Sequence, residues 1–251
     1  SIPVYGELPR KPRKLKNQEI VVNLEEPSEL SECFPLLAER MVALSDGNEG
    51  NPLSVLITST CSGEGKTYLS VNLALSLAVA GKKVLLMDMD LRKGALSALL
   101  GGAGKPGLGD LEQAGEGGWR SLVEQSPVSD HLDYLFAGTV PDHPSRLLLH
   151  YRIRKLMEEV KEQYDFIFMD CVPYSSLADA RIVARLADVT LYVMRAGCVK
   201  KRDLAGLQKI WKNGELKRMG IVLCDVEPHG RSSRGYAVYR SLDTSSPCAG
   251  K

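Results

Sequence analysis

Hydrophobic and polar positions alternate in blocks along the chain. The almost continuously apolar blocks predict buried strands at 53–59, 83–88, 133–137, 166–170, 189–195 and 220–225. Segments with helical spacing lie between them, at 66–80, 145–164, 178–186 and 201–212. Apolar strands that alternate with helices are typical of a mostly parallel sheet covered by helices on both faces. The pattern therefore predicts an α/β fold.

The two ends of the chain depart from this pattern. Residues 1–27 contain four prolines and predict irregular structure, while 28–44 has helical spacing that Pro35 interrupts, which favours a helix start near that residue. The segment 229–251 is polar and rich in Ser, Gly and Arg, which predicts a mobile tail. We therefore expect an N-terminal extension over 1–27, a domain over 28–228 and a tail over 229–251.

Composition narrows the class of protein. Hydrophobic residues make up 44% of the 251 positions and charged residues 25%, as in globular proteins. The formal net charge of +1 gives no general reason to expect nucleic-acid binding. The six cysteines lack paired short spacing and fit reduced thiols, and no apolar run is long enough to span a bilayer. The basic stretch 10–16 fits a solvated arm or a segment on the cytoplasmic side of a membrane helix.

A glycine-rich turn follows the first predicted buried strand. Residues 60–67, TCSGEGKT, fit the P-loop pattern G-x-x-x-x-G-K-[ST], except that Thr60 replaces the first glycine. In such a loop the backbone amides surround phosphate oxygens, Lys66 adds positive charge and the Thr67 hydroxyl binds Mg²⁺. The predicted nucleotide-binding residues are Ser62, Gly63, Glu64, Gly65, Lys66, Thr67 and Tyr68.

Carboxylates follow two other predicted strands. Asp88 ends the strand at 83–88 and Asp90 follows two positions later, while Asp170 ends the strand at 166–170. Carboxylates at the carboxyl ends of parallel strands are suited to hold the magnesium ion of a bound nucleotide. ATP is the expected nucleotide because no N-K-x-D motif for guanine is present. Asp179 and Asp188 are interpreted as residues at helix ends.

These motifs together resemble the bacterial tyrosine kinases, the cytoplasmic domains of polysaccharide co-polymerases. The resemblance rests on the altered P-loop, on D-x-D-x-R at 88–92, and on the apolar strand ending at Asp170. It extends to SIPVYGELPR at 1–10, AGTVPDHPSRLL at 137–148 and YDFIFMDCVPYSSLADA at 164–180. The Min/Par-type partition ATPases share the expected fold, but their P-loop carries a lysine where this chain has Cys61.

The resemblance implies roles for the predicted site residues. Lys66 and Thr67 would bind the phosphates and Mg²⁺, and the three aspartates would surround the metal and an attacking tyrosine. A phenol has a pKa near 10, so a carboxylate must accept or orient its proton. We favour Asp90 near the hydroxyl, with Asp88 and Asp170 on the metal, although the sequence does not decide which aspartate is the base. The acceptors implied are Tyr236 and Tyr239 in the tail.

The chain also departs from the family pattern. In the family, a first-helix motif E-x-x-R-x-x-R joins subunits. This chain has Glu32 at the glutamate position, but Pro35 and Ala38 replace the two arginines, and Arg40 is the nearest arginine that could substitute for them. Cys224 stands where an asparagine often lies near adenine. We favour a tyrosine autokinase because the set of three aspartates is complete. The alternatives are a non-catalytic ATP-binding scaffold of the exporter and a partition-type ATPase.

The resemblance also implies partners and a location. These are further copies of the chain, a membrane-spanning co-polymerase segment or activator, and a cognate tyrosine phosphatase, with no nucleic acid. The expected place is the cytoplasm at the inner face of the plasma membrane, in the control of capsular or exopolysaccharide synthesis. The sequence leaves open the polysaccharide, the oligomeric state, and whether phosphorylation occurs in cis or in trans.

Overall fold

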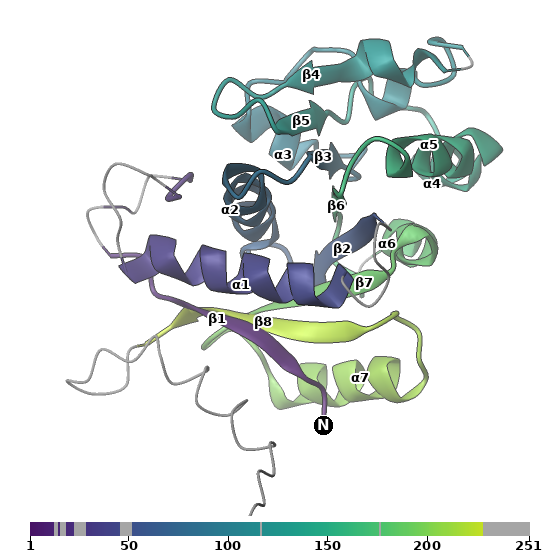
Figure 1. Ribbon diagram of the computed structural model, residues 1–251. Helices are drawn as coiled ribbons and strands as arrows, with labels where there is room; N and C mark the ends of the chain where they lie inside the picture. The colour runs from purple at the N-terminus through teal and green to yellow at the C-terminus, as the bar shows by residue number, and fades with distance from the viewer. Residues whose placement is uncertain are drawn as a thin grey trace, which may run out of the picture.

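An eight-stranded sheet forms the centre of the computed structural model, in the order β1-β8-β7-β2-β6-β3-β5-β4 (Figure 1). The structure describes residues 1–12, 15, 19–22, 29–45, 52–115, 117–175 and 177–227. Its strands are β1 (Val4–Pro9), β2 (Leu53–Ser59), β3 (Val84–Asp88), β4 (Val123–Gln125), β5 (Leu132–Leu135), β6 (Phe166–Asp170), β7 (Val189–Arg195) and β8 (Met219–Val226). All neighbouring strands pair in parallel except β4 and β5, which confirms the predicted sheet type.

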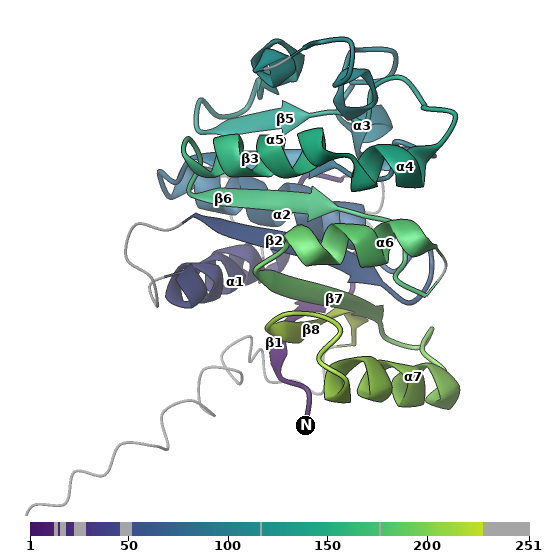
Figure 2. The same cartoon turned by 90° about the vertical axis from the view of Figure 1, so that its right-hand side faces the viewer.

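Helices cover both faces of the sheet, as the sequence predicted. They are α1 (Glu29–Ser45), α2 (Lys66–Val79), α3 (Ala95–Leu99), α4 (Pro144–Leu149), α5 (Tyr151–Lys161), α6 (Ala178–Val183) and α7 (Lys201–Lys212). Buried side chains of α1, α2 and α3 pack in one apolar cluster, and those of α4 to α7 pack in another. Figure 2 shows α5, α6 and α7 in front of the strands, with α1 and α2 behind them.

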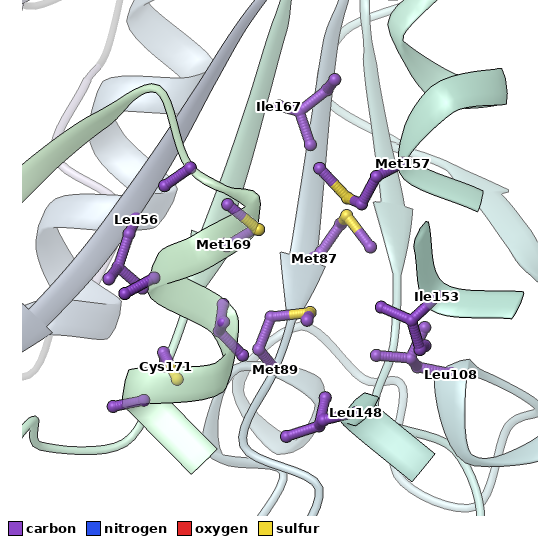
Figure 3. Packing of buried hydrophobic residues seen from close by; sticks show 14 of the residues in the cluster. Leu56, Met87, Met89, Leu108, Leu148, Ile153, Met157, Ile167, Met169 and Cys171 are labelled. Carbon is purple, nitrogen blue, oxygen red and sulfur yellow. The ribbon is translucent and has the colours of Figure 1, made fainter. Parts of the chain in front are cut away.

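The two apolar clusters fill the space between the sheet and the helices on its two faces. Helix α2 lies between the sheet and α1, and ten consecutive residues from Leu69 to Ala78 are buried. This position explains why α2 carries no charge after Lys66. On the other face, Met87 of β3, Met169 of β6 and Met157 of α5 belong to one cluster, in which the side chains of Met87 and Met157 point toward each other (Figure 3). Each fully buried apolar side chain stabilises the fold by about 1.5–3 kcal/mol.

The prediction of irregular structure over 1–27 was wrong for its first part. Val4–Pro9 forms edge strand β1, which pairs in parallel with β8, and Leu8 in this strand is buried. An edge strand tolerates proline at its end because the missing N–H is not needed for a ladder. The Arg10 N–H continues the pairing by donating to the Val226 carbonyl at 2.9 Å.

Two helix boundaries also differ from the sequence pattern. Helix α1 begins at Glu29 and runs through Pro35, because buried Phe34, Leu37 and Met41 fix it against the rest of the core. The helix expected over 145–164 is divided into α4 and α5 at His150, whose backbone is extended (φ −64°, ψ 144°).

In the part of the chain that the structure describes, no helix combines the length and the apolarity needed to cross a bilayer. Among the cysteines within it, Cys61, Cys171, Cys198 and Cys224 carry free thiols. Tyr236 and Tyr239 lie outside the described residues.

Candidate nucleotide-binding and catalytic site

The predicted P-loop connects β2 to the N-terminus of α2. Gly65, the residue before the helix, has φ +100°, a value that side-chain-bearing residues rarely adopt. The buried Glu64 carboxylate accepts the Cys61 N–H at 2.6 Å and closes the loop on itself. Within this described loop, the amides of residues 62–65 donate no hydrogen bond to another protein group. Free amides at the N-terminus of a helix form a binding site for phosphate.

Lys66 extends along this loop toward the sheet. Its Nζ donates to Ser59 Oγ at 3.0 Å, and the Ser59 hydroxyl donates to the Cys61 carbonyl at 2.6 Å. Burial lowers the pKa of Lys66, while the charges of Asp170 and Glu64 oppose that shift. A partly desolvated ammonium gains strongly from an arriving anion, which suits a role in binding phosphate.

Asp170 lies beside the first turn of α2. Its Oδ2 accepts the Thr67 hydroxyl at 2.7 Å and its Oδ1 accepts the Ser70 hydroxyl at 3.1 Å. Burial raises its pKa to about 7, with a further contribution from Asp88, and the hydroxyls and Lys66 only partly oppose this. The site therefore disfavours the ionised carboxylate unless a cation binds there.

Asp88 occupies the matching position on the neighbouring strand. It is paired in register with Asp170 and is completely buried. Its Oδ2 accepts both the N–H and the hydroxyl of Ser97, at 2.8 and 2.7 Å, and its Oδ1 accepts the Asp90 N–H at 3.1 Å. Burial raises the pKa of Asp88, against the hydrogen bonds from Ser97.

Asp90 lies on the turn after β3 and is more accessible than the other two aspartates. Its Oδ1 accepts the N–H groups of Arg92 and Lys93 at 3.2 and 3.1 Å. Asp90 is close enough to contribute to the electrostatic environment of Lys66. The structure thus brings the three predicted aspartates, Lys66 and Thr67 to one edge of the sheet.

The donor set fits a magnesium ion bound together with phosphates. Among the described residues, no three His, Cys, Asp or Glu side chains form a complete metal centre. Magnesium at nucleotide sites usually takes one or two protein oxygens and fills its other positions with phosphate and water. The adjacent Thr67 hydroxyl and Asp170 carboxylate are suited to be those protein oxygens.

Comparison with known proteins identifies the family. A family model described as "CobQ/CobB/MinD/ParA nucleotide binding domain" matches residues 55–250. The tyrosine-protein kinase YwqD of Bacillus subtilis is 31% identical over 231 residues, which cover 90% of this chain and 94% of YwqD. The chain belongs to the bacterial tyrosine kinases.

Other members of the bacterial tyrosine kinases are longer. The Ralstonia nicotianae relative EpsB is 35% identical over 80% of this chain, and the match spans only 27% of EpsB. The chain therefore spans about a quarter of the length of several curated relatives. The solved BceF tyrosine kinase domain superposes with a TM-score of 0.75 at 28% identity, covering 90% of this chain and 94% of that domain.

Positions where the chain departs from the bacterial tyrosine kinase pattern now have a structural description. Arg40, the possible substitute for the family's helix arginines, contacts its own chain: Nη1 donates to the carbonyls of Val4 and Tyr5 at 3.2 Å. Buried Cys224 packs under the P-loop, with Sγ 3.5 Å from where a Cβ on Gly65 would lie. Tyr68, one of the predicted nucleotide-binding residues rather than a departure, packs its ring edge-to-face with Phe34, so its side chain faces α1.

Several contributing residues were not predicted. Ser59, Ser70 and Ser97 each hold a charged group of the site, but an isolated serine carries no recognisable pattern. Ser70 alone had a usable signal, because it follows Lys66 by four positions and therefore shares its helix face. The helix-end interpretation of Asp179 was correct for its place in α6 but missed its ion pair with Arg92.

Proposed function

We propose that this chain is an ATP- and Mg²⁺-dependent protein-tyrosine autokinase whose acceptors are Tyr236 and Tyr239. One observation carries the proposal. In a member of the bacterial tyrosine kinases, Lys66, Thr67 and Asp170 converge on a loop of free amides. Asp88 lies in register with Asp170 on the adjacent strand β3, and Asp90 lies on the turn that follows.

Each group has a role in phosphoryl transfer. The amides of residues 62–65 and Lys66 bind the phosphate oxygens and offset negative charge there. Thr67 and Asp170, with Asp88 beside them, would hold Mg²⁺, which neutralises charge on the β- and γ-phosphates. Asp90 accepts the phenolic proton while the tyrosine oxygen bonds to the γ-phosphorus and the bond to the β-phosphate oxygen breaks. The products are phosphotyrosine and ADP.

The biological setting is the control of capsular or exopolysaccharide synthesis at the inner face of the plasma membrane. This part of the proposal rests on the family, in which such kinase domains act with a membrane-spanning co-polymerase segment or activator. A tyrosine phosphatase would reset the tail. The chain would also associate with further copies of itself, through contacts other than the helix arginines that join subunits in the family.

The experiment is to incubate the purified chain with ATP and Mg²⁺ and to measure its intact mass. We expect a gain of one or two phosphates, abolished by Lys66→Met and retained by Lys212→Met, which removes an exposed lysine at the end of α7. Tyr236→Phe with Tyr239→Phe should remove most of the gain.

Other outcomes would contradict the proposal. ADP release without added mass would indicate a hydrolytic ATPase of the partition type, and bound but unconsumed ATP would indicate a scaffold. Undiminished labelling of the double tyrosine variant would place the acceptor elsewhere. Tyr5 and Tyr174 are poor alternatives, because their hydroxyls donate to the Arg218 carbonyl and to Glu215, and Tyr174 is buried.

A further inference from the structure

The turn that carries Asp90 is fixed by its own backbone. Asp88 Oδ1 holds the Asp90 N–H, and the Gly94 N–H donates to the Asp90 carbonyl at 2.8 Å. The Asp90 carboxylate is held in turn by the N–H groups of Arg92 and Lys93. The direction of this carboxylate therefore depends on where the backbone of Arg92 lies.

The side chain of Arg92 fixes that backbone to two helices. Its Nε donates to Asp179 Oδ2 at 2.7 Å, and its Nη2 lies 3.5 Å from Asp179 Oδ1. The Ser145 hydroxyl donates to the same Oδ1, and Arg92 Nη2 lies 3.4 Å from Ser145 Oγ. Ser145 belongs to α4 and Asp179 to α6, and these helices contact each other. We call these three residues the Arg92 clamp.

The Arg92 clamp differs from an ordinary surface ion pair. Surface pairs contribute little, because both charges remain hydrated and mobile. Here the Asp179 side chain is only 3% exposed, while that of Arg92 is 40% exposed. Burial acts to raise the pKa of Asp179, but the hydrogen bonds from Arg92 and Ser145 outweigh it and lower that pKa. A buried, ionised carboxylate with two fixed donors is a rigid anchor.

We propose that the Arg92 clamp positions Asp90 for phosphoryl transfer, so that Arg92 and Asp179 are positioning residues for the acceptor side of the site. The inference rests on the proposed kinase function. The phosphate-binding side chains of the P-loop take no part in the Arg92 clamp. Lys66 is held by Ser59, and Thr67 is held by Asp170. Loss of the clamp should therefore slow transfer while leaving nucleotide binding nearly unchanged.

The chain offers a matched control at the opposite edge of the sheet. Asp188 accepts the Ser54 hydroxyl at 2.5 Å and Lys161 Nζ at 2.9 Å, which repeats the arrangement of an aspartate with one serine and one cation. Asp188 precedes β7 and Ser54 lies near the start of β2, so this group is at the amino ends of the strands. Asp188→Asn should lower stability without a specific effect on transfer.

The test compares Asp179→Asn, Arg92→Gln, their double variant and Asp188→Asn in the full chain. We expect kcat for autophosphorylation to fall by about ten- to a hundredfold in each clamp variant, with the Kd of a fluorescent ADP analogue changed by less than about twofold. The double variant should be no slower than the singles, because both act through one contact. The inference would be overturned if the losses of kcat in the two single variants multiplied in the double variant, or if kcat and nucleotide affinity fell equally. A normal kcat in folded Asp179→Asn would overturn it as well.

A second readout does not depend on kinase activity. The amides of Arg92, Lys93 and Gly94 should exchange hydrogen faster in Asp179→Asn, since the Asp90 turn that protects them loosens, and Asp188→Asn should leave them unchanged. Unchanged exchange in Asp179→Asn would refute the clamp even in an active kinase. If wild type transfers no phosphate but exchange responds as expected, the proposed function fails while the positioning of Asp90 stands.

Discussion

Replacing Asp170 by asparagine should make the protein more stable at pH 8 while it abolishes phosphoryl transfer. The physical reason is the raised pKa of this buried carboxyl group, from 3.8 to about 7. In the unfolded chain the group ionises near its ordinary value, so folding at pH 8 forces a charge into a site that disfavours it. Each pKa unit corresponds to about 1.4 kcal/mol, so the ionised carboxylate costs about 4 kcal/mol.

The direction in which the free energy of unfolding changes with pH follows from proton binding. Between about pH 4 and 7 the folded protein retains a proton on Asp170 that the unfolded chain has lost, so the free energy of unfolding falls as pH rises through that window. Asp170→Asn removes this dependence. An amide offers Thr67 and Ser70 one acceptor oxygen instead of two, which weakens one hydrogen bond worth about 1 kcal/mol.

We therefore expect Asp170→Asn to gain about 3 kcal/mol at pH 8, or about 6–12 °C in Tm, and almost nothing at pH 5. Urea unfolding at both pH values, without nucleotide, measures the difference. Asp188→Asn is a control of opposite sign, because hydrogen bonds from Ser54 and Lys161 outweigh burial and lower the pKa of Asp188. A variant that is no more stable than wild type at pH 8, or equally stabilised at both pH values, would refute the reasoning.

Two further substitutions test the conformation of the P-loop and the contact between α2 and the N-terminal residues Glu19 and Val21. Gly65→Ala should cost about 1–2 kcal/mol from its φ of +100° and also weaken nucleotide binding, whereas Gly81→Ala, at φ +81° beyond the end of α2, should cost as much and leave nucleotide Kd unchanged. Asn72→Ala should cost about 2–4 kcal/mol, because this buried amide binds Val21 N–H at 2.7 Å and the Glu19 carbonyl at 2.8 Å. Hydrogen exchange at Val21 should accelerate, and unchanged exchange there would contradict this role.

The predicted parts of the fold share a local signal. Strands such as β6 and β7 appear as continuous apolar runs because both faces of the sheet are covered, and their predicted bounds match the structure. The P-loop is recognisable because all its groups lie within eight consecutive residues. Edge strand β1 gave no such signal, since its pairing partner β8 lies more than 200 positions away and only part of the strand is buried.

The contrast between local signals and contacts of distant positions also applies to the site. Asp88, Asp90 and Asp170 were predictable because each follows an apolar run at the edge where ligands bind. The contacts that orient them were not, because Ser97 meets Asp88 across a turn and Arg92 meets Asp179 from 87 positions away. Sequence patterns describe positions along one element, whereas these hydrogen bonds join elements that only the tertiary fold brings together.

The distribution of buried charge explains why the site lowers the stability of the fold and what function that charge serves. In the part of the chain that the structure describes, the buried acidic side chains are Glu64, Asp88, Asp170 and Asp179, and all four lie at the carboxyl edge of the sheet. The Arg92 guanidinium compensates Asp179, and the Cys61 N–H binds Glu64. Asp88 and Asp170, in register on adjacent strands, retain raised pKa values. Negative charge left unbalanced at that one pair opposes folding, and it is the same charge that a divalent cation arriving with a nucleotide would neutralise.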